Sequence, residues 1–210
     1  GEYTHGDEVT ITATPNEGYH FVKWSDGETN ATRTITVTAD VTLTAEFAIN
    51  VYDVTLSAEN GIVTGAGSYN HGTEVTLTAT PNEGYHFVKW SDGDVNVTRT
   101  ITVTAEVTLT AEFAINRYTV TLSAENGTVT GAGEYAHGTE VTLTATPNEG
   151  YRFVKWSDGD TNATRTITVT SDVTLTAEFA INGYTVTLSA ENGTVTGAGE
   201  YAHGTEVTLT

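Results

Sequence analysis

The chain lacks the features that cross-link small domains or attach them to nucleic acid. It has no cysteine, three prolines and only 8 basic residues against 27 acidic ones. Without cysteine no disulfide can form. The absence of cysteine is compatible with both the cytosol and the cell exterior, so it does not identify the compartment of the protein. The net charge of −19 repels phosphate and anionic lipid, so no nucleic-acid partner is expected. No apolar run approaches the ~18–20 residues that span a bilayer, so no membrane insertion is expected in this segment.

What the chain has instead is internal repetition. The phrase Y-x-H-G-x-E-V-T begins at Tyr3 and returns every 66 residues (69 − 3 = 66), at Tyr69, Tyr135 and Tyr201. A period of this size marks a tandem array of small domains. Cut after the recurring Ala-Ile-Asn, the array divides into a partial repeat 1–50, complete modules 51–116 and 117–182, and a partial repeat 183–210. Methionine is also absent, and with both ends inside a repeat this predicts a stretch of a longer polypeptide.

The copy at 117–182 predicts an all-β module of about six strands. Apolar residues alternate with Thr or Ser at 118–124, 128–130, 141–145, 166–170 and 173–179, the period of a half-buried strand. Asn126-Gly127 is interpreted as the turn of a first hairpin. The aromatic segment 151–156 adds a strand whose large residues alternate sides, so it needs two covered faces or a β-bulge.

One tryptophan per repeat predicts the centre of each small core. Trp24, Trp90 and Trp156 are expected to be mostly buried, the third among Leu143, Tyr151, Phe153, Leu175 and Phe179. The seam between repeats is too short to behave as a flexible linker. Neighbouring repeats are therefore expected to touch, and the array to form an elongated rod.

The most distinctive phrase is G-T-E-V-T-L-T-A-T-P-N-E-G-Y-R-F-V-K-W-S-D-G, followed by T-I-T-V-T and V-T-L-T-A-E-F. It resembles the divergent internalin B-repeat modules, relatives of the Listeria–Bacteroides repeat on bacterial surface proteins. The match is carried in the second copy by Gly84, Tyr85, Phe87, Trp90, Ala111, Glu112 and Phe113. The resemblance implies an extracellular stalk or adhesin segment at the cell surface, and it brings no catalytic residues.

One turn in each repeat places side-chain oxygens at alternate positions. Calcium takes six to eight oxygen ligands from turns of this kind, so calcium is a candidate cofactor here, and no other cofactor is indicated. An ordinary Asp-Gly turn is the alternative, and no Glu stands at the twelfth position, which is Val169 when counted from Asp158. The candidate ligands are Asp92, Asp94, Asn96, Asp158, Asp160 and Asn162.

Three further sequence patterns each have an ordinary structural interpretation beside a functional one. One histidine per repeat (His5, His71, His137 and His203) is too widely spaced to form one metal site, and is read as a turn residue. The lysines (Lys23, Lys89 and Lys155) fit either an isopeptide crosslink near Glu46, Glu112 and Glu178 or a surface ion pair. Outward Thr-x-Thr runs fit an ice-ordering array or the ordinary preference of strands for Thr.

Two functions from different classes remain. No Ser-His-Asp set, phosphate loop or paired carboxylates appear, so no enzyme is expected. The first hypothesis is a structural segment that provides reach and spacing. The second is a multivalent sugar- or protein-binding array that uses Tyr151, Trp156 and Asp158 of each repeat. Exposed tryptophans would favour binding, and buried ones would favour the stalk.

The two partial repeats are complementary in sequence. Residues 1–50 lack the segment that corresponds to 52–65, and residues 183–210 contain it. Each half alone exposes unpaired strand edges. The expected partners are neighbouring repeats, either within a longer polypeptide, which is favoured, or through head-to-tail self-assembly of separate molecules.

Overall fold

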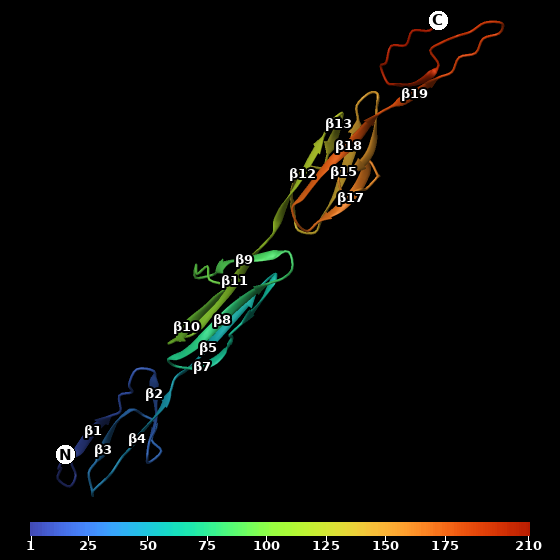
Figure 1. Cartoon of the computed structure of the whole chain (residues 1–210). Helices are drawn as coiled ribbons and strands as arrows, with labels where there is room; N and C mark the ends of the chain where they lie inside the picture. The colour runs from blue at the N-terminus through green and yellow to red at the C-terminus, as the bar shows by residue number, and fades with distance from the viewer. The chain divides into compact units, whose positions relative to one another are not determined.

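The computed structural model describes residues 1–210 and contains twenty strands, β1 to β20, and no helix (Figure 1). The chain divides into two compact units, Gly1–Ala114 and Ile115–Thr210. No long apolar helix suited to crossing a bilayer is present. The all-β expectation is confirmed.

Module 51–116 is a sandwich of two small sheets. One sheet has the order β7-β5-β11-β9 and the other β10-β8-β6. The first strand of the module, β5, runs parallel to the last, β11, with Val54 opposite Val107 and Ala58 opposite Ala111. The seven strands are β5 (Val51–Ala58), β6 (Gly61–Thr64), β7 (Gly67–Asn70), β8 (Thr73–Pro81), β9 (Tyr85–Trp90), β10 (Thr98–Val103) and β11 (Val107–Ile115).

Module 117–182 repeats this topology strand for strand, with sheets β14-β12-β18-β16 and β13-β15-β17. The count is seven strands and not six, because the segment Gly133–Ala136, which the alternating pattern did not assign to a strand, pairs with β12 as a short edge strand. The strands are β12 (Arg117–Ala124), β13 (Gly127–Thr130), β14 (Gly133–Ala136), β15 (Thr139–Pro147), β16 (Tyr151–Trp156), β17 (Thr164–Val169) and β18 (Val173–Ile181).

The Asn-Gly turn does not make the expected hairpin. Strands β12 and β13 on its two sides belong to different sheets, so the chain turns a corner from one layer of the sandwich to the other. Asn126 takes the left-handed conformation, with φ of 62°. Gly127 is needed for a different reason, since a Cβ there would lie 2.5 Å from Cζ of Phe179 and 2.7 Å from the carbonyl oxygen of Thr146.

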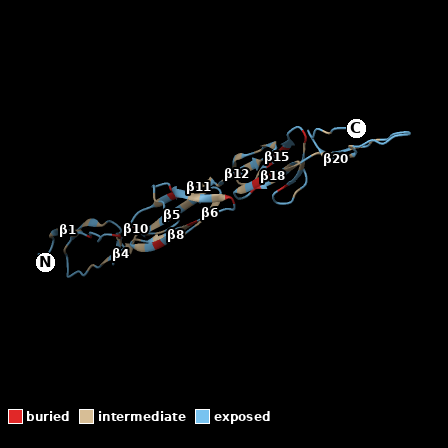
Figure 2. Cartoon of the chain, turned by 45° about the horizontal axis from the view of Figure 1, so that its top comes forward, coloured by how far each residue is buried: buried red, intermediate tan, exposed pale blue.

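The core of each complete module lies between its two sheets and contains the tryptophan, and Figure 2 shows the buried residues in red on the strands. The exposed fractions of Trp24, Trp90 and Trp156 are 7%, 0% and 0%, which confirms their predicted burial. Leu143 and Leu175 are buried with Trp156, and Phe153 and Phe179 pack half-buried against them, whereas Tyr151 lies outside this cluster.

The β-bulge expected in the aromatic strand is present. The register of β16 against β18 shifts between Phe153 and Lys155. Because of this shift Phe153 and Trp156 meet, with ring centroids 5.8 Å apart. The strand therefore needs only one covered face.

The partial repeats form fewer strands. Residues 1–50 contain β1 (Glu8–Thr12) paired with β3 (Thr32–Thr36), and β2 (Tyr19–Trp24) paired with β4 (Ala45–Ile49). Residues 183–210 contain only β19 (Gly183–Val186) and β20 (Gly199–Ala202), which pair antiparallel.

Candidate functional site

The turn after each aromatic strand, which we call the Asp loop (residues 92–96 and 158–162), is closed by an arginine. Nη1 of Arg99 lies 2.7 Å from Oδ2 of Asp92, and Nε lies 3.4 Å from Oδ2 of Asp94. Oδ1 of Asp94 accepts hydrogen bonds from the backbone N–H and the side-chain amide of Asn96, both at 2.8 Å. The indole N–H of Trp90 donates to the carbonyl oxygen of Asn96 at 2.9 Å, so the loop also fixes the core tryptophan.

The Asp loop of the next module has the same geometry. Arg165 lies 2.6 Å from Asp158 and 3.3 Å from Asp160. The hydrogen bond from the arginine is the main cause that holds the pKa of Asp158 below its usual 3.8, and Arg99 lowers the pKa of Asp92 in the same way. The carboxylates of each Asp loop are therefore paired with an arginine of the same module.

A second recurring arrangement lies at the seam, defined here as Gly18, Asn50 and His71. The backbone N–H of Asn50 donates to the carbonyl oxygen of Gly18 at 2.8 Å, and its own carbonyl accepts from the N–H of His71 at 2.8 Å. The imidazole of His71 covers Gly18 so closely that a Cβ on Gly18 would lie 2.6 Å from its Cγ. Nδ1 of His71 is buried without a hydrogen-bond partner.

The same seam recurs in the other unit. Asn182 bonds Gly150 at 2.7 Å and accepts from His203 at 2.8 Å, and the ring of His203 covers Gly150. The repeating histidine is thus a joint residue between consecutive repeats, a role that its turn position in the sequence did not reveal. The sequence feature that could have indicated this role is the constant spacing between the histidine and the Asn that ends each repeat.

Four stretches, 1–51, 52–117, 118–183 and 184–210, match the divergent InlB B-repeat domain. The chain belongs to this family. The matched boundaries fall one residue after those expected from the seam, and the two complete matches correspond to the two seven-stranded sandwiches. The features that recur between the B-repeats of this chain are the tryptophan core, the Asp loop and the seam.

Among relatives, the B-repeat chain is 27% identical to a putative membrane protein of Evansella cellulosilytica, over 94% of the chain and 32% of the relative. It is 31% identical to a putative Gly-rich membrane protein of the same organism, over 74% of the chain and 19% of the relative. It is also 31% identical to internalin H of Listeria monocytogenes, over 50% of the chain and 21% of the relative. The chain thus spans less than a third of the length of each.

The candidate calcium ligands of each Asp loop lie close together, but a positively charged arginine side chain already lies beside their carboxylates. The guanidinium of Arg165 contacts Asp158 and Asp160, and Oδ1 of Asp160 is bonded to Asn162. The chain has no group of three or more His, Cys, Asp or Glu side chains that could hold a metal ion. Calcium at Asp92, Asp94, Asn96 or their counterparts stays a prediction, in which the ion would compete with arginine.

The proposed ligand surface at Tyr151, Trp156 and Asp158 needs correction. Trp156 is fully buried, because the bulge turns it into the core, so its indole offers no face to a sugar. Tyr151 is half-buried, and Asp158 is exposed but bound to Arg165. The three residues do not form a shared surface.

The lysines form surface ion pairs. Nζ of Lys89 lies 3.7 Å from Oε2 of Glu112, with exposed side-chain fractions of 46% and 47%. The pairs Lys23–Glu46 and Lys155–Glu178 are alike. An isopeptide bond would need a buried lysine, so this exposure favours the ion-pair reading.

Proposed function

We propose that this chain is a structural segment of an extracellular bacterial surface protein, in which tandem B-repeats provide reach and spacing. The observation that carries the proposal is that the recurring aromatic and charged side chains are engaged inside each repeat or at its seam. The tryptophans are buried, and the Asp loops are closed by arginine. No catalytic role is proposed, and multivalent binding through the indoles loses its support.

Location at the cell surface is supported by the relatives. One is internalin H, and two others are described as membrane proteins. The net charge of −19 also suits a segment that must stay soluble and avoid anionic lipid. The whole protein would supply whatever anchor or binding domain completes the function.

The seam supports a stiff spacer. Asn50 is the one residue between β4 and β5, and its backbone is hydrogen-bonded to Gly18 on one side and to His71 on the other, so this junction has little freedom. A flexible Gly/Ser linker would have no such bonds. Each junction is therefore expected to hold one preferred angle.

Small-angle scattering of the chain tests this spacer role. We expect a narrow distribution of inter-module distances, and a control with a Gly/Ser linker inserted after Asn50 should broaden it. A chain without residues 51–116 should keep its fold and lose the length of one module. A wild-type distribution as broad as that of the linker control would contradict the spacer function.

A further inference from the structure

Two histidines lie at the seam between residues 1–50 and module 51–116, and their ring nitrogens have different surroundings. Nδ1 of His20 donates a hydrogen bond to Oδ1 of Asn50 at 2.8 Å, and this side chain is exposed. Nδ1 of His71 is buried and has no hydrogen-bond partner. A protonated imidazole carries an N–H on both of its nitrogens. Protonation therefore has different consequences for the two rings.

The ring of His71 lies between groups from both repeats. It covers Gly18 on one side, where an added Cβ would lie 2.6 Å from its Cγ. On the other side it packs against Tyr52, with ring centroids 6.1 Å apart. The backbone N–H of the same histidine donates to the carbonyl oxygen of Asn50 at 2.8 Å, and Asn50 is the one residue between β4 and β5. A displacement of this ring therefore acts directly on the junction.

No side chain around the ring accepts a hydrogen bond from Nδ1 of His71. Tyr69 on β7 donates to the carbonyl oxygen of Gly65 at 3.1 Å. Glu106, in the turn after β10, accepts the backbone N–H of Asp53 at 2.7 Å. The glutamates of the turn before Gly18 and of β8 are exposed. The titratable side chains on the elements around the ring are Glu17, His20, Tyr52, Asp53, Tyr69, Glu74 and Glu106.

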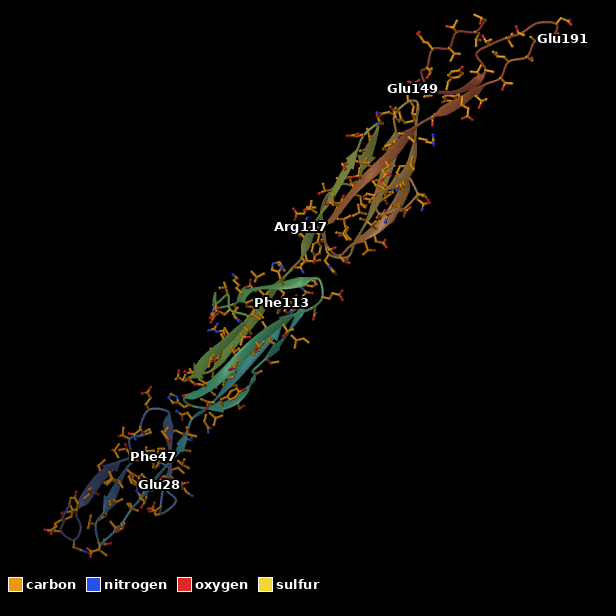
Figure 3. All side chains as sticks on the ribbon, viewed as in Figure 1. Glu28, Phe47, Phe113, Arg117, Glu149 and Glu191 are labelled. Atoms are coloured by element: carbon orange, nitrogen blue, oxygen red, sulfur yellow. The ribbon has the colours of Figure 1, made fainter.

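The same surroundings recur at His137 in the second unit. Its backbone N–H donates to the carbonyl oxygen of Asn116 at 2.8 Å, and its ring centroid lies 6.0 Å from that of Tyr118. Its Nδ1 is also buried without a partner. Glu149, the counterpart of Glu17, lies on the turn at the end of module 117–182 and is exposed (Figure 3). The unpartnered nitrogen is thus a repeated feature of the seams.

We propose that the seam is a pH-dependent joint, which is closed while His71 is neutral and opens when its imidazole is protonated. Imidazole is the side chain that ordinarily changes charge between pH 5 and 8. On protonation Nδ1 becomes a charged donor without an acceptor, and burial of such a group is costly. Movement of the ring into solvent removes this cost and breaks its hold on Asn50. The joint rests on the proposed spacer function and adds to it a stiffness that acid lowers.

The modules themselves should keep their fold over this pH range. Their Asp loops stay paired, because hydrogen bonds from arginine hold the pKa of Asp92 and that of Asp158 below the usual 3.8. The buried core contains no polar or charged side chain. His20 tolerates protonation as well, since Oδ1 of Asn50 accepts from its Nδ1. Acid in this range therefore acts on His71 and its counterparts.

Hydrogen exchange of the Asn50 amide in the full chain, at about pH 7.5 and about pH 5.5, tests the joint. This amide donates to the carbonyl oxygen of Gly18. Its protection factor, which corrects for the intrinsic effect of pH on exchange, should fall at least about tenfold at the lower pH. The amides of β8 and β11 should stay protected. A wild-type protection factor that does not fall would overturn the proposal.

Two variants identify the group that is responsible. His71→Phe keeps an aromatic ring over Gly18 that cannot take up a proton, so it should abolish the fall. His20→Arg is the matched control, because Arg152 stands at this position in the third copy, and it should leave the fall unchanged. An equal fall in wild type and His71→Phe would overturn the proposal, as would its loss in His20→Arg.

Small-angle scattering at the same two pH values separates the joint from the spacer function. The distribution of inter-module distances in wild type should be narrow at the higher pH and broader at the lower one. A chain with both His71→Phe and His137→Phe should give a narrow distribution at both. A wild type that is narrow at both values would overturn the joint and leave the spacer function intact. A wild type that is broad at both would contradict the spacer function and the joint with it.

Discussion

Replacing Gly18 by alanine tests the seam directly. Gly18 has φ of +77° and lies beneath the ring of His71. Alanine at this position meets two separate costs. The left-handed backbone costs about 1–2 kcal/mol for a residue with a Cβ, and the Cβ would lie 2.6 Å from Cγ of His71, so the imidazole must leave its place.

Gly27→Ala is the control that isolates the second cost. Gly27 belongs to the same repeat and has φ of +92°, but nothing lies within 4 Å of its added Cβ. Both substitutions should lower the free energy of unfolding by the same amount through the left-handed backbone. Only Gly18→Ala should also weaken the two backbone hydrogen bonds of Asn50. One is donated to the carbonyl oxygen of Gly18 and the other is accepted from the N–H of His71, both at 2.8 Å.

Hydrogen exchange of the Asn50 and His71 amides is the assay. A loss of about 1.4 kcal/mol at the seam corresponds to about tenfold faster exchange. We expect that increase or more in Gly18→Ala and no change in Gly27→Ala. Adding His71→Ala to Gly18→Ala should remove the clash and show coupling of about 1–3 kcal/mol in a double-mutant cycle. Equal exchange in the two glycine variants would refute the reasoning.

Two further predictions follow from the core and the Asp loop. Trp156→Ala should destabilise its module by ~3–5 kcal/mol, measured by denaturant unfolding, and a loss well below that range would mean that the indole is not the centre of the core. Arg165 lowers the pKa of Asp158, so the ion pair stabilises the folded module. This stabilisation is complete above the usual pKa of 3.8 and is lost as the pH falls through the lowered pKa. Arg165→Ala should bring the carboxyl titration back toward 3.8 and reduce the acid dependence of stability, and an unchanged NMR titration of Asp158 would contradict the pairing.

Local patterns predicted much of each module. The 66-residue period, the alternation of Thr with apolar residues and the single tryptophan specified a small all-β core, and the position of Phe153 relative to Trp156 indicated the bulge. These features depend on neighbours within a few residues. The same alternation could not show on which side of the bulge Trp156 lies, which is why a ligand surface at Tyr151, Trp156 and Asp158 stayed an alternative beside the expected burial of Trp156.

The features that sequence reasoning missed depend on distant contacts. Asn126-Gly127 has the composition of a hairpin turn, but β12 finds its partner in β18, about fifty residues later in the chain. The need for Gly127 comes from Phe179, which no local pattern indicates. Likewise, Arg165 closes a loop that begins seven residues earlier, and the oxygens of that loop alone resemble a calcium turn.

The parallel pairing of the first and last strands has a mechanical consequence. The chain enters a module at the start of β12 and leaves it at the end of β18, and these strands lie side by side from Val120 to Ala124 and from Val173 to Ala177. A pull on the two ends therefore slides the strands along each other and loads their hydrogen bonds together, in shear. An antiparallel terminal pair would instead be peeled apart one bond at a time. Each module is built so that tension along the polypeptide meets its most resistant direction.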